Sequence, residues 1–245
     1  MCEVHPGKVN PNDLLAVSMI RASIPGMERL LGREPAAPYI LLLTGPPGAM
    51  KSTFALTTIS HHLSRTGEFG LYCTVEESVE SLLRSSESVG LSLPGNLQIT
   101  DFTELRTENQ DMDYLRFTER MCEHFKAEQG DNFSCFVLDS LGAIYSLTEV
   151  DVNMRKKMFA FFDALRRMNL FVIIITERQY GDHAEHQGNE GFLADGIINL
   201  SLDRRNGRLV RTLQIEKMRH TRHIMDKQAM EPTTNGMTIM GPLIE

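Results

Sequence analysis

The sequence predicts an α/β domain with a mostly parallel, twisted sheet flanked by helices and with an antiparallel hairpin extension at the C-terminal end. Two observations support this prediction. Short runs of aliphatic and β-branched residues alternate with amphipathic stretches of helical period between residues 39 and 176. Beyond residue 195 the helical stretches stop, and Asn206-Gly207 separates two segments as in a tight hairpin.

The first buried strand and the helix after it enclose a glycine loop. Residues 39–44 are apolar, the sequence from Gly45 to Gly48 interrupts them, and a helix then runs to a glycine at position 67. Other strands are expected at 70–75, 96–100, 133–138, 170–176, 196–203, 208–215 and 236–240. Other helices are expected at 24–31, 78–89, 111–128 and from 154 to 168.

Length and composition indicate one domain, residues 23–245, preceded by a loosely held N-terminal arm, residues 1–22. Acidic residues exceed basic ones, 32 against 25, and the net charge of −7 argues against nucleic acid as a partner. The four cysteines (Cys2, Cys73, Cys122 and Cys135) form no CxxC motif, which favours reduced thiols in a cytoplasmic protein. No signal peptide or membrane-spanning run is evident, so no membrane insertion is expected.

The loop has the spacing of a phosphate-binding loop. Its backbone N–H groups can converge on a β-phosphate, Lys51 can reach the β and γ oxygens, and the Ser52 hydroxyl can ligate Mg²⁺. A chance cluster is the alternative, and the strand before and helix after the loop argue against it. The residues expected to bind the nucleotide are Gly45, Pro47, Gly48, Ala49, Met50, Lys51, Ser52 and Thr53.

Met50 departs from the usual pattern, because the residue before the lysine is most often glycine. We expect nucleotide binding to require that Met50 adopts an ordinary helical φ and points its thioether away from the phosphates.

Acidic residues follow two of the buried strands. Asp139 ends the strand at 133–138, where it can hold Mg²⁺ through water, although a strand-capping aspartate without that function is the alternative. Glu76 and Glu77 follow the strand at 70–75. They can activate a water molecule, or they can be a solvated start of the next helix, and spacing alone does not separate these two interpretations.

Cations and histidines occur near the C-terminal strands. Lys217 and Arg219 are two residues apart, so both can reach one anion from the same face of a strand; a solvated edge strand is the plain alternative. The loop with Asp182, His183 and His186 could bind a metal, but a polar loop without that function is the better interpretation.

Several stretches together resemble the KaiC-like branch of the RecA-type P-loop ATPases, a family named for the cyanobacterial circadian clock protein. The resemblance extends from about residue 23 to about residue 241. It depends on the ordered set IPGMERLLG, GPPGAMKST, TVEES, FVLDS, IITER, FLADGIINL, GRLVRTLQIEKMRHTRH and GMTIM.

This resemblance implies a RecA-like P-loop NTPase fold, ATP and Mg²⁺ as cofactors, and catalytic roles for Glu76 and Glu77. It also implies a hexamer in which Lys217, Arg219, Thr221 and His223 reach the nucleotide of the neighbouring subunit. Most clock proteins of the family carry two such domains in tandem, and this chain resembles a single-domain relative.

The resemblance also bears on what the ATPase is used for. Residues 186–196 contain no hydroxyl residue, so self-phosphorylation at the family's site is not expected, and His220 replaces a frequent glycine. Slow ATP hydrolysis with a regulatory role is the main hypothesis. The alternatives are a nucleotide sensor that does not hydrolyse ATP and recruits a protein partner, as in motility motors, and a relative of DNA recombination ATPases.

Overall fold

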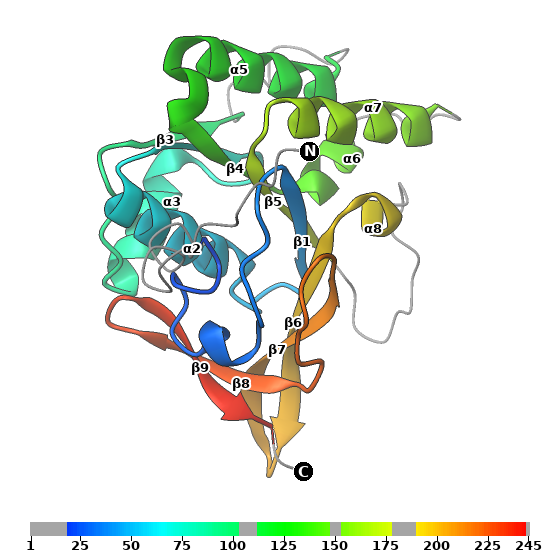
Figure 1. The fold of residues 1–245 in the computed structure, drawn as a ribbon. Helices are drawn as coiled ribbons and strands as arrows, with labels where there is room; N and C mark the ends of the chain where they lie inside the picture. Colours follow the sequence, from blue (N-terminus) through cyan, green and yellow to red (C-terminus); the bar gives the residue numbers. More distant parts are fainter. Residues whose placement is uncertain (1–18, 103–111, 148–152, 178–189, 244–245) are drawn as a thin grey trace, which may run out of the picture.

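The computed structural model describes residues 19–102, 112–147, 153–177 and 190–243. In this part of the chain, nine strands form one sheet in the order β3-β2-β4-β5-β1-β6-β7-β8-β9 (Figure 1). Neighbours from β3 to β6 are parallel, and neighbours from β6 to β9 are antiparallel. The expected fold class is therefore confirmed. The strands are β1 (Tyr39–Gly45), β2 (Phe69–Thr74), β3 (Leu97–Asp101), β4 (Phe133–Asp139), β5 (Phe171–Glu177), β6 (Gly196–Arg205), β7 (Arg208–Met218), β8 (Gln228–Thr233) and β9 (Gly236–Pro242).

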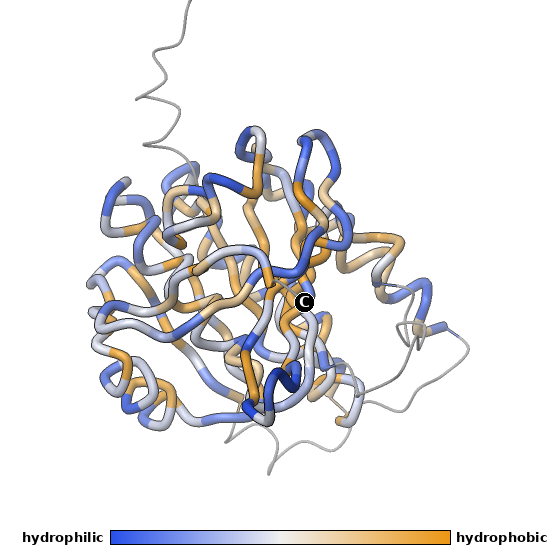
Figure 2. The backbone as a smooth tube through the Cα atoms, turned by 90° about the horizontal axis from the view of Figure 1, so that it is seen from below, coloured by the Kyte–Doolittle hydropathy of each residue, from blue (hydrophilic) through white to orange (hydrophobic). Residues whose placement is uncertain are grey.

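Helices cover both faces of the parallel part of the sheet. The apolar side chains of α2 and α3 share one buried cluster with β8 and β9, while α5, α6 and α7 share a second cluster on the other face (Figure 1). Hydrophobic segments gather in the interior and hydrophilic ones at the periphery (Figure 2). The helices are α2 (Lys51–Thr66), α3 (Val79–Ser88), α5 (Tyr114–Gln129), α6 (Leu141–Leu147), α7 (Met154–Arg167) and α8 (Glu190–Leu193), with 3-10 turns at Met27–Arg29 and Gly130–Asn132.

Local signals in the sequence place several boundaries correctly. Ser78 caps α3, because its hydroxyl accepts a hydrogen bond from the backbone N–H of Ser81 at 3.3 Å. Asn206 and Gly207 both have left-handed φ angles, 47° and 77°, as a tight hairpin turn between β6 and β7 requires.

Three elements differ from expectation. Helix α6 and strand β8 were not predicted, and the helix expected at 24–31 is only a 3-10 turn. Helix α6 is only seven residues long and starts one residue after β4, and strand β8 contains Pro232, so neither gives a strong periodic signal in the sequence.

The expected N-terminal arm is only partly covered by the structure. Residues 1–18 lie outside the described residues, as do Asp182, His183 and His186 of the possible metal loop. Met19 and Ile20 are buried in the core, and the Ile20 N–H donates to Glu34 Oε1 at 2.6 Å. The last residues of the expected arm therefore pack on the domain.

Three thiols are free and buried, those of Cys73, Cys122 and Cys135, while Cys2 lies outside the described residues. Burial raises the pKa of Cys135 to about 12, so this thiol is unreactive. None of the helices in the described ranges is both long and apolar enough to cross a bilayer.

Candidate nucleotide-binding site

The loop between β1 and α2 begins at Gly45, whose backbone conformation favours glycine. Gly45 has a φ of 151°, and a Cβ on it would lie 2.2 Å from the carbonyl oxygen of Leu200 on the neighbouring strand β6. Only glycine fits here without moving backbone. Gly48 also has a left-handed φ, 82°, although the space beside it is open apart from Leu202 at 3.9 Å.

Met50 does not have the expected helical φ. It is left-handed, with φ 67° and ψ 38°, so this part of the prediction is wrong. The chain must turn at this position before entering α2, and alternating right- and left-handed residues are what make successive N–H groups converge on an anion. The side chain packs against the apolar cluster on the α2 face.

Lys51 lies over the loop that precedes it. Its Nζ donates to the carbonyl oxygens of Gly45 at 3.0 Å and Pro46 at 3.2 Å. Burial lowers the pKa of Lys51, and the carboxylates of Glu177, Asp139 and Glu76 oppose this shift. The ammonium group therefore lies where a phosphate chain would meet the loop.

Strand β4 places Asp139 near Lys51 and Ser52, and the groups around its carboxylate suit a magnesium ligand. The residue is 9% exposed, and its carboxylate accepts a hydrogen bond from Tyr72 Oη at 2.6 Å. Burial raises the pKa of Asp139, and hydrogen bonds from Ser52 and Tyr72 oppose this effect. The two expected metal-binding groups, Ser52 and Asp139, are thus in hydrogen-bond contact.

No group of three His, Cys, Asp or Glu side chains able to hold a metal occurs among the described residues. Proteins usually bind Mg²⁺ through one or two carboxylates together with phosphate oxygens and water. Asp139 and Ser52 fit that pattern when a triphosphate supplies the remaining ligands.

Glu76 and Glu77 turn in different directions. Glu76 Oε1 accepts a hydrogen bond from Ser140 Oγ at 2.9 Å, next to Asp139. Glu77 Oε2 accepts one from Ser81 Oγ at 3.3 Å in the first turn of α3. Glu76 is therefore the carboxylate closer to the metal-binding groups, whereas Glu77 also contributes to the start of a helix.

A hollow of about 210 Å³ lies between the loop and α3. Its walls combine apolar side chains with serine hydroxyls, which suits part of a nucleoside. The lining residues are Gly48, Met50, Lys51, Ser52, Thr53, Leu56, Glu77, Leu82, Ser85, Ser86, Val89 and Leu91.

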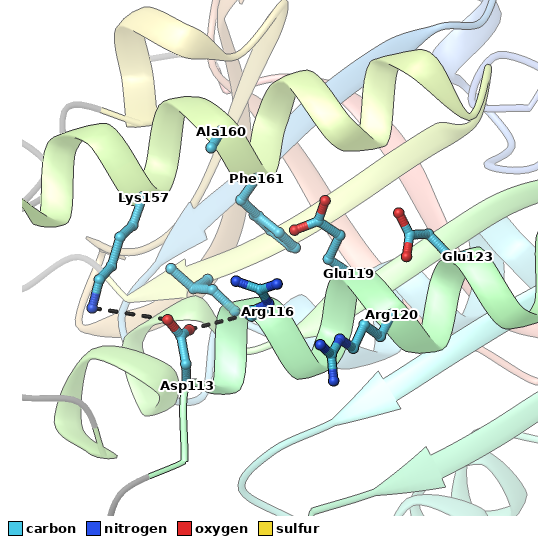
Figure 3. A pocket seen from close by; sticks show the side chains of 9 residues that line it. Asp113, Arg116, Glu119, Arg120, Glu123, Lys157, Ala160 and Phe161 are labelled. Atoms are coloured by element: carbon cyan, nitrogen blue, oxygen red, sulfur yellow. Dashed lines mark hydrogen bonds and ion pairs between the residues drawn. The ribbon is translucent and has the colours of Figure 1, made fainter.

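A second hollow, of about 380 Å³, lies between α5 and α7 and is lined by charged residues of both signs (Figure 3). It contains none of the expected site residues.

Lys217 and Arg219 are not brought to this loop. Arg219 follows β7, and its N–H binds Asp195, whose own N–H binds Ile40 near the start of β1. From Ile40 to Gly45 is roughly 16 Å along a strand. Both cations point to one segment: Lys217 Nζ donates to the carbonyls of Gly191 and Ala194, and Arg219 Nη1 to Asp195 Oδ1.

Thr221 and His223 lie in the same remote region. The Thr221 hydroxyl donates to the carbonyl oxygen of Arg33 at 2.8 Å, and His223 pairs with Leu31 in an isolated bridge. His220, between them and the cations, has a left-handed φ of 65°, which explains why glycine suits this position. In one subunit, therefore, none of these four expected residues reaches its own phosphate loop.

Two residues near the loop were missed in the sequence. Glu177 ends β5 beside β1 and acts electrostatically on Lys51. The sequence pattern that could have identified Glu177 is the same as for Asp139, an acidic residue at the end of a buried strand. Arg211 Nε donates to the Gly48 carbonyl at 3.4 Å, and no local pattern indicates that contact.

Comparisons with known proteins identify the family of this chain. The family model described as "ATPase: KaiC" matches residues 20–243. The circadian clock oscillator protein KaiC of Nostoc sp. is 26% identical over 234 residues, covering 91% of this chain and 44% of that protein. A UPF0273 protein of Thermotoga maritima is 27% identical over 243 residues, covering 91% of this chain and 96% of that protein.

A solved structure adds to these matches. The crystal structure of a KaiC-like protein from the hyperthermophilic archaeon Pyrococcus horikoshii gives a TM-score of 0.72 at 29% identity, covering 91% of this chain and 99% of that one. The chain spans less than half the length of the clock protein from Nostoc but nearly all of the Thermotoga protein. With its phosphate-binding loop in place and the family match covering residues 20–243, the chain belongs to the KaiC family of P-loop ATPases.

Proposed function

We propose that this protein binds ATP with Mg²⁺ at the loop between β1 and α2 and hydrolyses it slowly in a ring of like subunits. Lys51 and the loop amides bind the phosphates, Ser52 and Asp139 hold Mg²⁺, and Glu76 with Glu77 activates water. The observation that supports this best is the convergence of Lys51, Ser52, Asp139 and Glu76 at one edge of the sheet.

The ring is part of the proposal because Lys217 and Arg219 lie away from the phosphate-binding loop of their own chain. Lys217 and Arg219 lie toward the far end of β1 and carry donors that an adjoining subunit's γ-phosphate can use. A hexamer, a cytoplasmic location and a regulatory role with a protein partner belong to the same proposal. The buried thiols and the negative net charge support the location and argue against nucleic acid.

Measurement of ATP turnover tests the catalytic part. We expect the variant Glu76→Gln/Glu77→Gln to bind ATP as tightly as wild type but to release phosphate at least about a hundredfold more slowly. Glu80→Gln is the matched control, because Glu80 is an exposed carboxylate in the first turn of α3. Turnover of the double variant equal to wild type would show that the catalytic assignment is wrong.

Light scattering after size exclusion tests the assembly. A hexamer that forms with ATP and Mg²⁺ supports the shared site. A monomer under all conditions, with tight ATP binding and no phosphate release, would instead favour the nucleotide sensor. Salt-sensitive binding of single-stranded DNA would favour the recombination relative.

A further inference from the structure

Helix α8 contacts Lys217 and Arg219, the two cations that each subunit of the proposed ring would place in the ATP site of the next subunit. Lys217 Nζ donates to the carbonyl oxygens of Gly191 at 3.0 Å and Ala194 at 2.7 Å. Arg219 Nη2 donates to the carbonyl oxygen of Phe192 at 3.4 Å. Helix α8 and the two cationic groups therefore hold each other in place.

Helix α8 cannot set its own position. It has four residues, and an isolated helix of that length is not stable in water. Its place in the fold is determined by the side chains that bind it. At its C-terminal side these include the cations Lys217, Arg219 and Arg166, the last of which contacts both the Leu193 carbonyl and Asp195. At its N-terminal side the contact is a different one.

Glu190, the first residue of α8, is buried, with 1% of its surface exposed. Its Oε2 accepts a hydrogen bond from Tyr145 Oη at 3.1 Å. Burial, together with the nearby Glu190, raises the pKa of Tyr145, so the phenol keeps the proton that it donates. A buried carboxylate needs such donors, so this contact helps to fix the start of α8.

Tyr145 belongs to α6, which begins two residues after Asp139. Ser140, between them, binds Glu76 through its hydroxyl and caps α6 through the Ala143 N–H at 3.2 Å. One continuous set of contacts thus runs from the metal-binding end of β4 through α6 and Tyr145 to α8. It ends at the cations that the next subunit would use.

We propose that Tyr145 and Glu190 are positioning residues for the shared ATP site: they hold α8, and with it Lys217 and Arg219, where the neighbouring subunit needs them. This inference rests on the proposed ring. Lys217 has three N–H donors, and two of them bind carbonyl oxygens of residues 191 and 194, so within the described part of the chain one donor is left for a phosphate oxygen. The function of the pair is thus to orient a donor that is still available.

The variant Tyr145→Phe removes the hydroxyl and keeps the ring of the side chain. We expect kcat for ATP to fall about tenfold, while the affinity for ADP, which lacks the γ-phosphate, stays at the wild-type value. Tyr114→Phe is the matched control, because Tyr114 is also a buried tyrosine and belongs to α5 rather than to α6. A wild-type kcat for Tyr145→Phe would overturn the inference.

Mixed rings separate positioning from simple structural damage. Lys51→Ala subunits cannot bind phosphate, but they carry an intact α8. When they are added in excess to Tyr145→Phe subunits, each Tyr145→Phe pocket gains a neighbour with well-placed cations. We then expect turnover per Tyr145→Phe subunit to rise at least fivefold. Damage inside the subunit's own pocket would not be relieved by a neighbour.

The same mixture with Lys217→Ala in place of Tyr145→Phe tests the shared site itself. Recovery of both variants supports the inference. Recovery of Lys217→Ala alone overturns it and leaves the shared site standing, while recovery of neither overturns both. If Tyr145→Phe does not fold, Glu190→Gln enters the same mixtures with the same expected recovery, because it weakens the same contact from the other side.

Discussion

The hydrogen bond from Tyr72 to Asp139 offers a direct test of the proposed metal-binding end of β4. Tyr72 is fully buried, and its hydroxyl lies 2.6 Å from the carboxylate. Tyr72→Phe removes this donor without changing the shape of the ring. A hydrogen bond to a charged group contributes about 1.5–3 kcal/mol, so we expect the free energy of unfolding to fall by about 2 kcal/mol at neutral pH. For a domain of this size the Tm then falls by about 4–8 °C.

The pH dependence of this effect has a defined sign. The hydrogen bond favours the charged form of Asp139, so its loss raises the pKa of Asp139 beyond what burial already does. Asp139 is charged above its pKa, so the destabilisation is full above that pKa and shrinks as the pH falls through it. The acid limb of Mg²⁺-dependent ATP turnover moves to higher pH for the same reason.

Denaturant unfolding of the nucleotide-free protein at neutral and acidic pH measures the stability change, and ATP turnover against pH measures the second effect. Tyr114→Phe again serves as the control for a buried tyrosine. Tyr72→Phe with unfolding free energies equal to wild type at both pH values would refute the reasoning. So would a destabilisation that grows as the pH falls.

Three further changes test the loop and the turn near the cations. His220→Gly is expected to raise the stability by about 0.5–1 kcal/mol, because it relieves a left-handed φ at an exposed residue; a lower Tm would contradict this. Gly45→Ala is expected to cost at least about 3 kcal/mol, since its Cβ meets backbone at 2.2 Å, whereas Gly207→Ala has open space and costs only about 1–2 kcal/mol; similar losses would contradict this. Glu177→Gln lowers the pKa of Lys51, so the alkaline limb of ATP binding moves to lower pH; an unmoved limb would contradict this.

The sequence predicts the elements whose signals are local. The glycine loop, the Ser78 cap and the Asn206-Gly207 turn each depend on residues within a few positions of one another, and all three are found in the structure. Helix α6 and strand β8 escaped prediction because β4 and β7 determine where they lie. For such elements, contacts distant in sequence override weak local preference.

The same distinction holds within the site. Asp139 could be placed at a strand end from the sequence, whereas the remoteness of Lys217 and Arg219 depends on the register of β6 against β1 and of β7 against β6. Met50 shows the limit in another way. A residue that disfavours a left-handed φ adopts it because the loop geometry requires that turn, so the intrinsic preference of the residue misled the prediction.

The phosphate loop follows Gly45, whereas Arg219 lies beside the start of β1. A contact that brings Arg219 of one copy to the loop of another is therefore head-to-tail. An open row of copies would leave a loop without cations at one end and cations without a loop at the other, and only cyclic closure removes both. Turnover per copy is then expected to increase with protein concentration and to level off once every row has closed.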